Sequence, residues 1–294
     1  MIYVERKERP AILDLEDQGS KGYIEYQAAL THFRTNDRAF NFDVYSDPKV
    51  KEALIGMFHG KCAYCEREVI SIDYGDVEHF RPKQAYRRAK GQDLIYPGYY
   101  WLAMDWNNLL LSCTKCNQKY KKNLFPIVDE SQRKTTHDAQ MQEEPLLIDP
   151  CNKNDDPAAH FEYTTAGVIQ SKTDKGKTSI QVYGLHRKEL KDRREKFVKN
   201  IEDRKAQVIQ YIQNVKLFSR LPADQEIAKA IENNLRDLKI CFEFLHKSVN
   251  DPTEEFQGIA RKFATDFITR QEPVVRPLLE LFGKMTGEPQ VLAK

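Results

Sequence analysis

Hydrophobic positions spaced three and four residues apart predict two helices near the start of the chain. In residues 23–33, tyrosine, alanine and leucine side chains recur on one face. Residues 47–60 predict a second helix, which the sequence Ser46-Asp47-Pro48 opens in a way typical of helix starts. We expect the apolar face of the second helix to pack on the segment that follows. That face consists of Val50, Leu54, Ile55 and Phe58.

The same helical spacing dominates the chain after residue 185. Residues 190–215 and 227–245 repeat apolar side chains at these intervals, and residues 252–268 and 274–285 predict two further helices. Charges of both signs alternate on the remaining positions, which is typical of helix faces in water, with docking of a partner as the alternative. The pattern predicts a mainly helical C-terminal domain.

Alternating apolar and polar residues predict short strands in the middle of the chain. Four apolar residues alternate around a turn at residues 74–76, which predicts a strand pair with Glu78 and His79 at the end of its second strand. Residues 145–150 and 161–170 predict two more strands, after a polar linker. The alternating residues are Val69, Ile72, Val77 and Phe80, and the expected core includes Trp101 and Trp106.

Composition limits the classes of protein to be considered. The chain has 294 residues, 31% of them charged, and a net charge of +2, so any nucleic-acid interface must be local. No apolar run reaches the roughly 18 residues of a membrane helix, and the N-terminus is too charged for a signal peptide. We expect a cytoplasmic protein, with two domains favoured by its length, and no membrane partner.

Four of the six cysteines form two CxxC pairs, Cys62/Cys65 and Cys113/Cys116. Two such pairs are typical of a structural zinc ion bound tetrahedrally by thiolates. Disulfides are rare in cytoplasmic proteins, and a redox CxxC normally occurs singly. A role as a fifth ligand is the alternative for His59 beside the first pair, although a surface or core histidine is expected there because four cysteines are already available.

The order of polar residues around these cysteines resembles the HNH nucleases. Glu78-His79, then Asn108, then Asn117 directly after Cys116 give the pattern EH–N–CxxCN. The segments VEHFRPK, YYWLAMDWNNLLLSC, LLIDPCNKNDDPAAHF and YGLHRKEL are similar to the HNH subunit of Septu-type and related retron-associated anti-phage systems. The resemblance covers residues 60–195.

This resemblance implies an α+β fold: a zinc-stapled ββα-metal (HNH) nuclease core with a mainly helical C-terminal region. The helix of that core is expected over residues 112–123. Three domains are predicted: an N-terminal helical or extended segment (1–57), an HNH nuclease domain with zinc knuckles and accessory strands (58–184), and a helical C-terminal domain (185–294).

The resemblance also implies roles for individual residues. His79 is the expected general base, since histidine titrates near neutrality. Glu78 and Asn117 are expected to bind Mg²⁺ or Mn²⁺ through oxygen atoms, which these hard cations prefer. Asn108 is expected to tie a loop and orient the histidine. The lysine that is common three residues after the last asparagine is replaced by Tyr120.

Basic residues gather around the expected site, and we interpret them as contacts to nucleic-acid backbone phosphates. An ordinary solvated surface is the alternative. The residues are Arg81, Lys83, Arg87, Arg88, Lys115, Lys119 and Lys121.

The sequence therefore favours a metal-dependent HNH endonuclease that cleaves DNA as the effector of an anti-phage system. The family implies control by a partner ATPase of the ABC/SMC-like type, since this chain contains no nucleotide-binding motif of its own. One alternative is an effector of the same fold that cleaves RNA such as tRNA. Another is a non-catalytic, zinc-dependent module for nucleic-acid binding or assembly, which would not need Glu78, His79 and Asn117.

Overall fold

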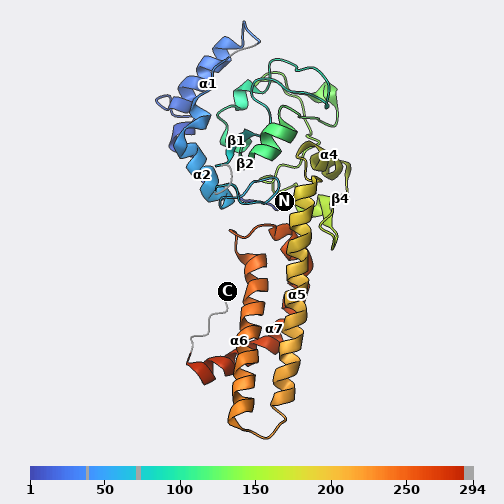
Figure 1. Ribbon diagram of the computed structural model, residues 1–294. Coiled ribbons are helices and arrows are strands. Elements are labelled where there is room, and N and C mark those ends of the chain that lie inside the picture. Colours follow the sequence, from blue (N-terminus) through green and yellow to red (C-terminus); the bar gives the residue numbers. More distant parts are fainter. Residues whose placement is uncertain (38–39, 71–73, 288–294) are drawn as a thin grey trace. The chain divides into compact units, whose positions relative to one another are not determined.

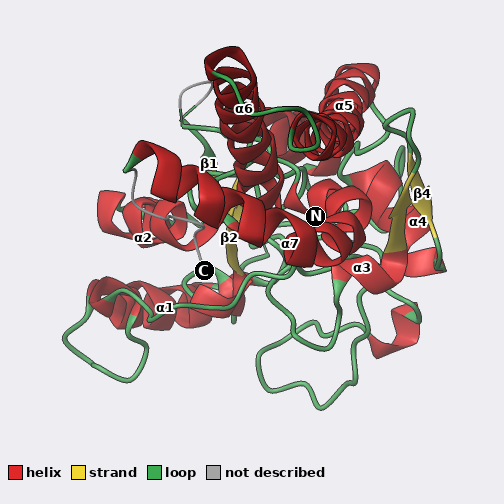
Figure 2. Ribbon diagram, turned by 90° about the horizontal axis from the view of Figure 1, so that it is seen from below, coloured by secondary structure: helices red, strands yellow, loops and turns green. Residues whose placement is uncertain are grey.

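The computed structural model describes residues 1–37, 40–70 and 74–287. The chain divides into two compact units (Figure 1). The first comprises Met1–Glu162 and Ile169–Arg187, and the second comprises Tyr163–Val168 and Lys188–Lys294. Strands form only two small sheets in the described residues, and most of the regular structure is helical (Figure 2).

The two predicted N-terminal helices are present as α1 (Lys21–His32) and α2 (Pro48–Phe58). The Ser20 hydroxyl accepts a hydrogen bond from the Tyr23 backbone N–H at 2.9 Å, which caps α1. The Asp47 carboxylate caps α2 in the same way, and a proline occupies the first turn of this helix. As predicted, α2 packs on the next segment, where it contacts both strands of the central sheet.

The central sheet pairs β1 (Asp76–His79) with β2 (Leu109–Ser112) in antiparallel register, so that His79 lies opposite Leu109. The strand pair predicted within residues 68–80 is therefore wrong about the partner of β1. Ile72, in its first half, lies outside the described residues. All four residues of β2 are buried, and a strand covered on both faces lacks the alternation that predicts strands from sequence.

The segments around β2 are short and irregular. The 3-10 helices η3 (Tyr100–Leu102) and η4 (Trp106–Asn108) precede it, and both tryptophans are buried in the core as expected. After β2, the helix predicted over residues 112–123 is a shorter π-helix, η5 (Lys115–Lys121). It ends at Lys122, whose positive φ of 49° breaks the helical path. A further 3-10 helix, η6 (Glu130–Gln132), follows.

Two further strand predictions, within residues 145–170, are wrong. Residues 145–150 form no strand, and only Pro145 pairs, in an isolated bridge with Ile127. Residues 161–170 are not one strand, because Gly167, with a φ of 71°, turns the chain between β3 (Phe161–Tyr163) and β4 (Ile169–Ser171). The helices α3 (Pro157–His160) and α4 (Asp174–Val182), which flank this hairpin, were not predicted.

The second unit contains three long helices, α5 (Lys188–Phe218), α6 (Gln225–Asn250) and α7 (Gln257–Thr286). All three contact one another around a shared hydrophobic core. α7 corrects the prediction of two separate helices, because it continues through Pro273 and Pro277. A proline inside a helix costs about 3 kcal/mol, and buried side chains on both sides of the prolines, such as Ile268 and Leu279, offset that cost.

Among the helices of the described residues, none combines the length and the apolar character that crossing a bilayer requires.

Candidate functional site

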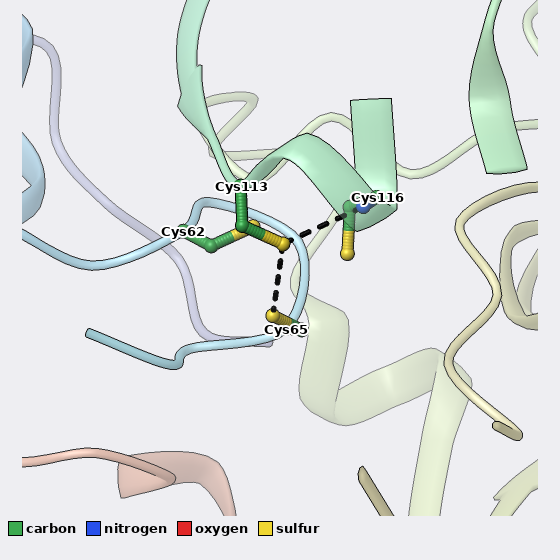
Figure 3. Close-up of side chains that lie close together, drawn as sticks. All are labelled: Cys62, Cys65, Cys113 and Cys116. Carbon is green, nitrogen blue, oxygen red and sulfur yellow. Dashed lines mark hydrogen bonds between the residues drawn. The ribbon is translucent and has the colours of Figure 1, made fainter. Parts of the chain in front are cut away.

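The four cysteines of the CxxC pairs form one buried cluster in the first unit (Figure 3). Their sulfur atoms all lie within 4.8 Å of one another, with 3.9 Å between those of Cys65 and Cys113. A tetrahedral zinc ion with Zn–S bonds of about 2.3 Å needs sulfur atoms about 3.8 Å apart. The donor set and its spacing therefore fit a metal such as zinc.

Local backbone contacts bring the two pairs together. After α2, His59 and Gly60 adopt positive φ values of 52° and 70°, which turns the chain toward Cys62. The Ala63 N–H then donates a hydrogen bond to the Leu111 carbonyl at 2.8 Å, which joins the first pair to β2. The second pair spans the end of β2 and the start of η5. His59 is exposed and is not part of the sulfur cluster.

His79 is buried at the end of β1, with 6% of its surface exposed. Its Nε2 lies 2.9 Å from the Ala103 carbonyl oxygen. Because a carbonyl only accepts hydrogen bonds, Nε2 holds the proton, and Nδ1 is the acceptor in the neutral ring. Burial, and next the Lys83 ammonium, hold the pKa of His79 well below its ordinary value. The ring is therefore neutral at pH 7, and Tyr45 packs edge-on against it.

Asn108 ties the chain after β1 to the segment before β2. Its Oδ1 accepts a hydrogen bond from the Arg81 N–H at 2.7 Å. Its Nδ2 donates to the carbonyls of Arg81 and Leu102, at 3.0 and 3.1 Å. These bonds hold the loop after His79 against η3, close to the carbonyl of Ala103 that orients the imidazole.

Glu78 and Lys121 form a buried ion pair between β1 and η5. Lys121 Nζ lies 2.5 Å from Glu78 Oε1 and donates to the His79 carbonyl at 2.8 Å. Tyr64, which stands between the first two cysteines in the chain, donates a hydrogen bond from its hydroxyl to the same Glu78 oxygen at 3.3 Å. Burial raises the pKa of Glu78, and the Lys121 ammonium opposes that rise. Lys121 is therefore inside the protein, whereas the sequence placed it at a nucleic-acid surface.

Asn117, expected to bind a metal ion together with Glu78, contacts the carboxylate of Asp76. Its Nδ2 donates to Asp76 Oδ2 at 3.0 Å, and Gln118 Nε2 donates to the same oxygen at 3.0 Å. Asp76 and Glu78 are two residues apart on β1, so both side chains point to one face of the strand. The expected metal ligands Glu78 and Asn117 thus lie on facing elements, each with its own direct partner.

The other basic residues predicted to contact phosphates differ in their exposure to solvent and in their contacts within the protein. Ion pairs 2.9 and 3.0 Å long join Arg81 to Glu143 and Arg88 to Glu130. Lys83 places its ammonium 4.0 Å from the centre of an aromatic ring. The exposed members of the set are Arg88, Lys115 and Lys119, and the half-buried ones are Arg81, Lys83 and Arg87.

Several residues of this site were not predicted from the sequence. Asp76 had a usable signal, because it precedes Glu78 by two positions on a predicted strand and therefore shares its face. Tyr45 and Tyr64 had none, because their contacts join segments that are distant in sequence.

Comparison with known proteins gives three similar chains. Septu protein PtuB of Bacillus mycoides (strain KBAB4) is 41% identical over 280 residues, which cover 95% of this chain and 94% of that protein. Septu protein PtuB of Bacillus thuringiensis is 30% identical over 188 residues, covering 63% and 55% respectively. Septu protein PtuA of Bacillus mycoides is 30% identical over 131 residues, which are 44% of this chain but 18% of that protein. No family model and no solved structure matches the chain.

Proposed function

The chain belongs to the family of the Septu PtuB proteins, and on that premise we propose that it is a metal-dependent HNH endonuclease. Its reaction is hydrolysis of phosphodiester bonds in nucleic acid, with DNA as the favoured substrate, and its role is that of an effector in anti-phage defence. The observation that supports this proposal best is the buried, neutral imidazole of His79, which the Ala103 carbonyl orients at the end of β1.

His79 is the proposed general base. Its Nε2–H is held by the Ala103 carbonyl, so Nδ1 is the nitrogen that accepts a proton from the attacking water. The same carbonyl then stabilises the imidazolium that forms, because it accepts a stronger hydrogen bond from a charged donor. Asn108 acts indirectly, by fixing the backbone on either side of this contact.

Glu78 and the amide oxygen of Asn117 are the proposed ligands of Mg²⁺ or Mn²⁺. When bound, such an ion neutralises charge on the phosphoryl oxygens and on the leaving oxygen. Two carboxylates of β1, those of Asp76 and Glu78, point toward η5, where Asp76 accepts a hydrogen bond from Asn117. Because Glu78 is paired with the Lys121 ammonium, an ion bound by Glu78 would have to replace that ammonium.

Zinc is the metal that we propose the four cysteines bind, and its role is structural. The sulfur atoms come from the loop after α2 and from the junction of β2 with η5. A zinc ion bound by these cysteines would hold the helix that contains Asn117 beside the strand that contains His79.

The proposed partners are nucleic acid and a second Septu protein. The exposed Lys115 and Lys119 on η5 supply positive charge for backbone phosphates. The second protein is of the PtuA type and is expected to be an ABC/SMC-like ATPase that controls cleavage.

The experiment that tests this function compares the wild type with His79→Ala on plasmid DNA and on total tRNA. Each substrate is incubated with Mg²⁺, Mn²⁺ or EDTA, with and without a PtuA-type protein. Loss of a general base should slow metal-dependent cleavage by about 100-fold or more, with zinc content unchanged. His137→Ala, which alters an exposed histidine in a loop, is the control and should cleave as the wild type does.

The outcomes separate the alternatives. Cleavage of tRNA without cleavage of plasmid would identify the RNA-cleaving effector. If folded, zinc-loaded protein cuts neither substrate under any condition, the non-catalytic zinc module for nucleic-acid binding or assembly is the better description.

A further inference from the structure

A turn of the first unit, residues 183–187, follows α4 and lies against the cysteine cluster. The Tyr183 ring stacks on the Tyr64 ring, with 3.9 Å between their centres and planes 14° apart. Tyr64 stands between Cys62 and Cys65 in the chain, so this stack joins the turn to the first cysteine pair. Both tyrosines are completely buried, which makes the contact part of the core.

The other end of this turn reaches the second cysteine pair. Arg187 Nη1 lies 3.4 Å from Cys116 Sγ and donates to the Gly184 carbonyl at 3.0 Å. Gly184 has a φ of 63°, and a Cβ atom there would lie 2.3 Å from the ring of Tyr120 on η5. Only glycine permits this close approach. The turn therefore contacts both cysteine pairs and the helix that starts at the second pair.

The charge of a zinc centre explains why an arginine is placed here. Four thiolates and one Zn²⁺ ion have a net charge of about −2, and all four cysteines are buried. A buried net charge is costly unless a counter-charge and hydrogen bonds accompany it. The Arg187 guanidinium is itself buried, with 5% of the residue exposed, and its N–H points at a ligand sulfur.

We propose that Arg187 is the positioning residue and counter-charge of the zinc centre, and that it slows the loss of zinc. Its hydrogen bond to Cys116 Sγ holds that sulfur in ligating position, and the stack of Tyr183 on Tyr64 anchors the turn at the first pair. Partners in the outer shell of a metal site act in this way. The inference rests on the zinc binding proposed above, and it gives the YGLHRKEL segment a function outside the catalytic residues.

The test measures release of zinc from the full-length protein into a chromogenic chelator under native conditions. Arg187→Gln removes the charge, and Arg187→Lys keeps it but loses the planar group of donors. We expect Arg187→Gln to release zinc about 10- to 100-fold faster than the wild type, and Arg187→Lys to release it at an intermediate rate. In Co²⁺-substituted protein, the sulfur-to-cobalt charge-transfer band should shift in the Arg187→Gln variant.

Arg133→Gln is the matched control. Arg133 is as buried as Arg187 and lies in the same unit, but its hydrogen bonds go to Glu130, Tyr99 and the Phe125 carbonyl. A general loss of stability would affect both variants, whereas loss of a thiolate counter-charge affects only Arg187→Gln.

The outcomes distinguish the inference from its premise. A folded wild-type protein without zinc would refute zinc binding itself. If the wild type binds zinc but Arg187→Gln releases it at the same rate, the role of Arg187 is refuted while zinc binding stands. The same conclusion follows if Arg133→Gln accelerates zinc release as much as Arg187→Gln does. If Arg187→Gln does not fold, Arg187→Lys provides the test of the role of Arg187. A zinc-release rate and a cobalt spectrum equal to those of the wild type in Arg187→Lys would then refute the inference.

Discussion

Glu78 and Lys121 form a buried ion pair in the first unit whose two members depend on each other. Both side chains are buried, and the ammonium satisfies the carboxylate and the His79 carbonyl together. Taking two charges out of water costs several kcal/mol for each, which their mutual attraction offsets only while both are present. Each residue therefore depends on the other for its place in the core.

Replacing Lys121 by methionine should lower the free energy of unfolding by about 3–5 kcal/mol, because it leaves the Glu78 carboxylate buried without its cation. The double variant Glu78→Gln, Lys121→Met should recover most of that loss. Urea unfolding of zinc-loaded protein measures both changes. Lys119→Met is the control, since this exposed side chain on the same helix should change stability by less than about 0.5 kcal/mol. Equal stability of Lys121→Met and Lys119→Met would show that the pair contributes nothing.

Sequence identified the residues of this site better than their contacts. The four cysteines were predicted as one cluster because CxxC spacing is local and only one metal chemistry fits two such pairs. The contact of His79 with the Ala103 carbonyl and that of Lys121 with Glu78 were not predicted. Both depend on the register of β1 against β2 and on where η5 lies, and neither is encoded in the spacing of residues along the chain.

At the scale of elements, the local pattern predicted helices well and strands poorly. α1, α2, α5 and α6 each show a period of three to four residues over at least three turns, which their own sequence determines. β2 is only four residues long and is buried on both faces, so its sequence has no period. α7 shows the opposite error, because packing against α5 and α6 keeps helical a segment that its prolines alone would divide.

α6 contains a histidine whose burial should make the stability of the second unit depend on pH. Burial, opposed by Glu272 and assisted by Arg276, lowers the pKa of His246 below its ordinary value of 6.5. The unfolded chain therefore takes up this proton at higher pH than the folded protein does. The contribution of the neutral His246 ring to the free energy of unfolding is complete above pH 6.5. It should be lost as the pH falls from 6.5 through the lower pKa that His246 has in the folded protein.

The pH effect is measured by urea unfolding, followed by circular dichroism, at pH 7.5 and 5.5. His246→Phe removes the titrating group and keeps a ring beside Phe242, whose ring makes an edge-on contact with that of His246, with 4.8 Å between their centres. This variant should lose less stability between the two pH values than the wild type does. His137→Phe, at an exposed position, should keep the wild-type difference. An unchanged difference in His246→Phe would refute the assignment.

For the whole molecule, the division into two units predicts an unequal response to loss of zinc. Wild-type protein should contain about one zinc per chain, and Cys62→Ser with Cys113→Ser should remove it. The first unit contains the whole cysteine cluster, whereas α5, α6 and α7 have a hydrophobic core of their own. We expect hydrogen exchange to become faster across β1, β2 and η5, with α5–α7 still protected.

Hydrogen exchange detected by mass spectrometry resolves these segments in the full-length chain. Replacement of Cys151, a half-buried cysteine outside the cluster, provides the control and should leave zinc content and both protection patterns unchanged. Equal loss of protection in α5–α7 when zinc is removed would mean that the two units unfold as one.

The pairing of β1 with β2 fixes both ends of residues 80–108, and the length of this loop can differ among proteins of the family. The entropy lost on closing a loop grows only with the logarithm of its length, so doubling such a loop costs about 0.6 kcal/mol. Gly91, near the middle, is exposed, has a φ of 85° and has open space where a Cβ would be. Insertions and deletions among related proteins should therefore accumulate around this turn, while the spacing within each cysteine pair stays constant.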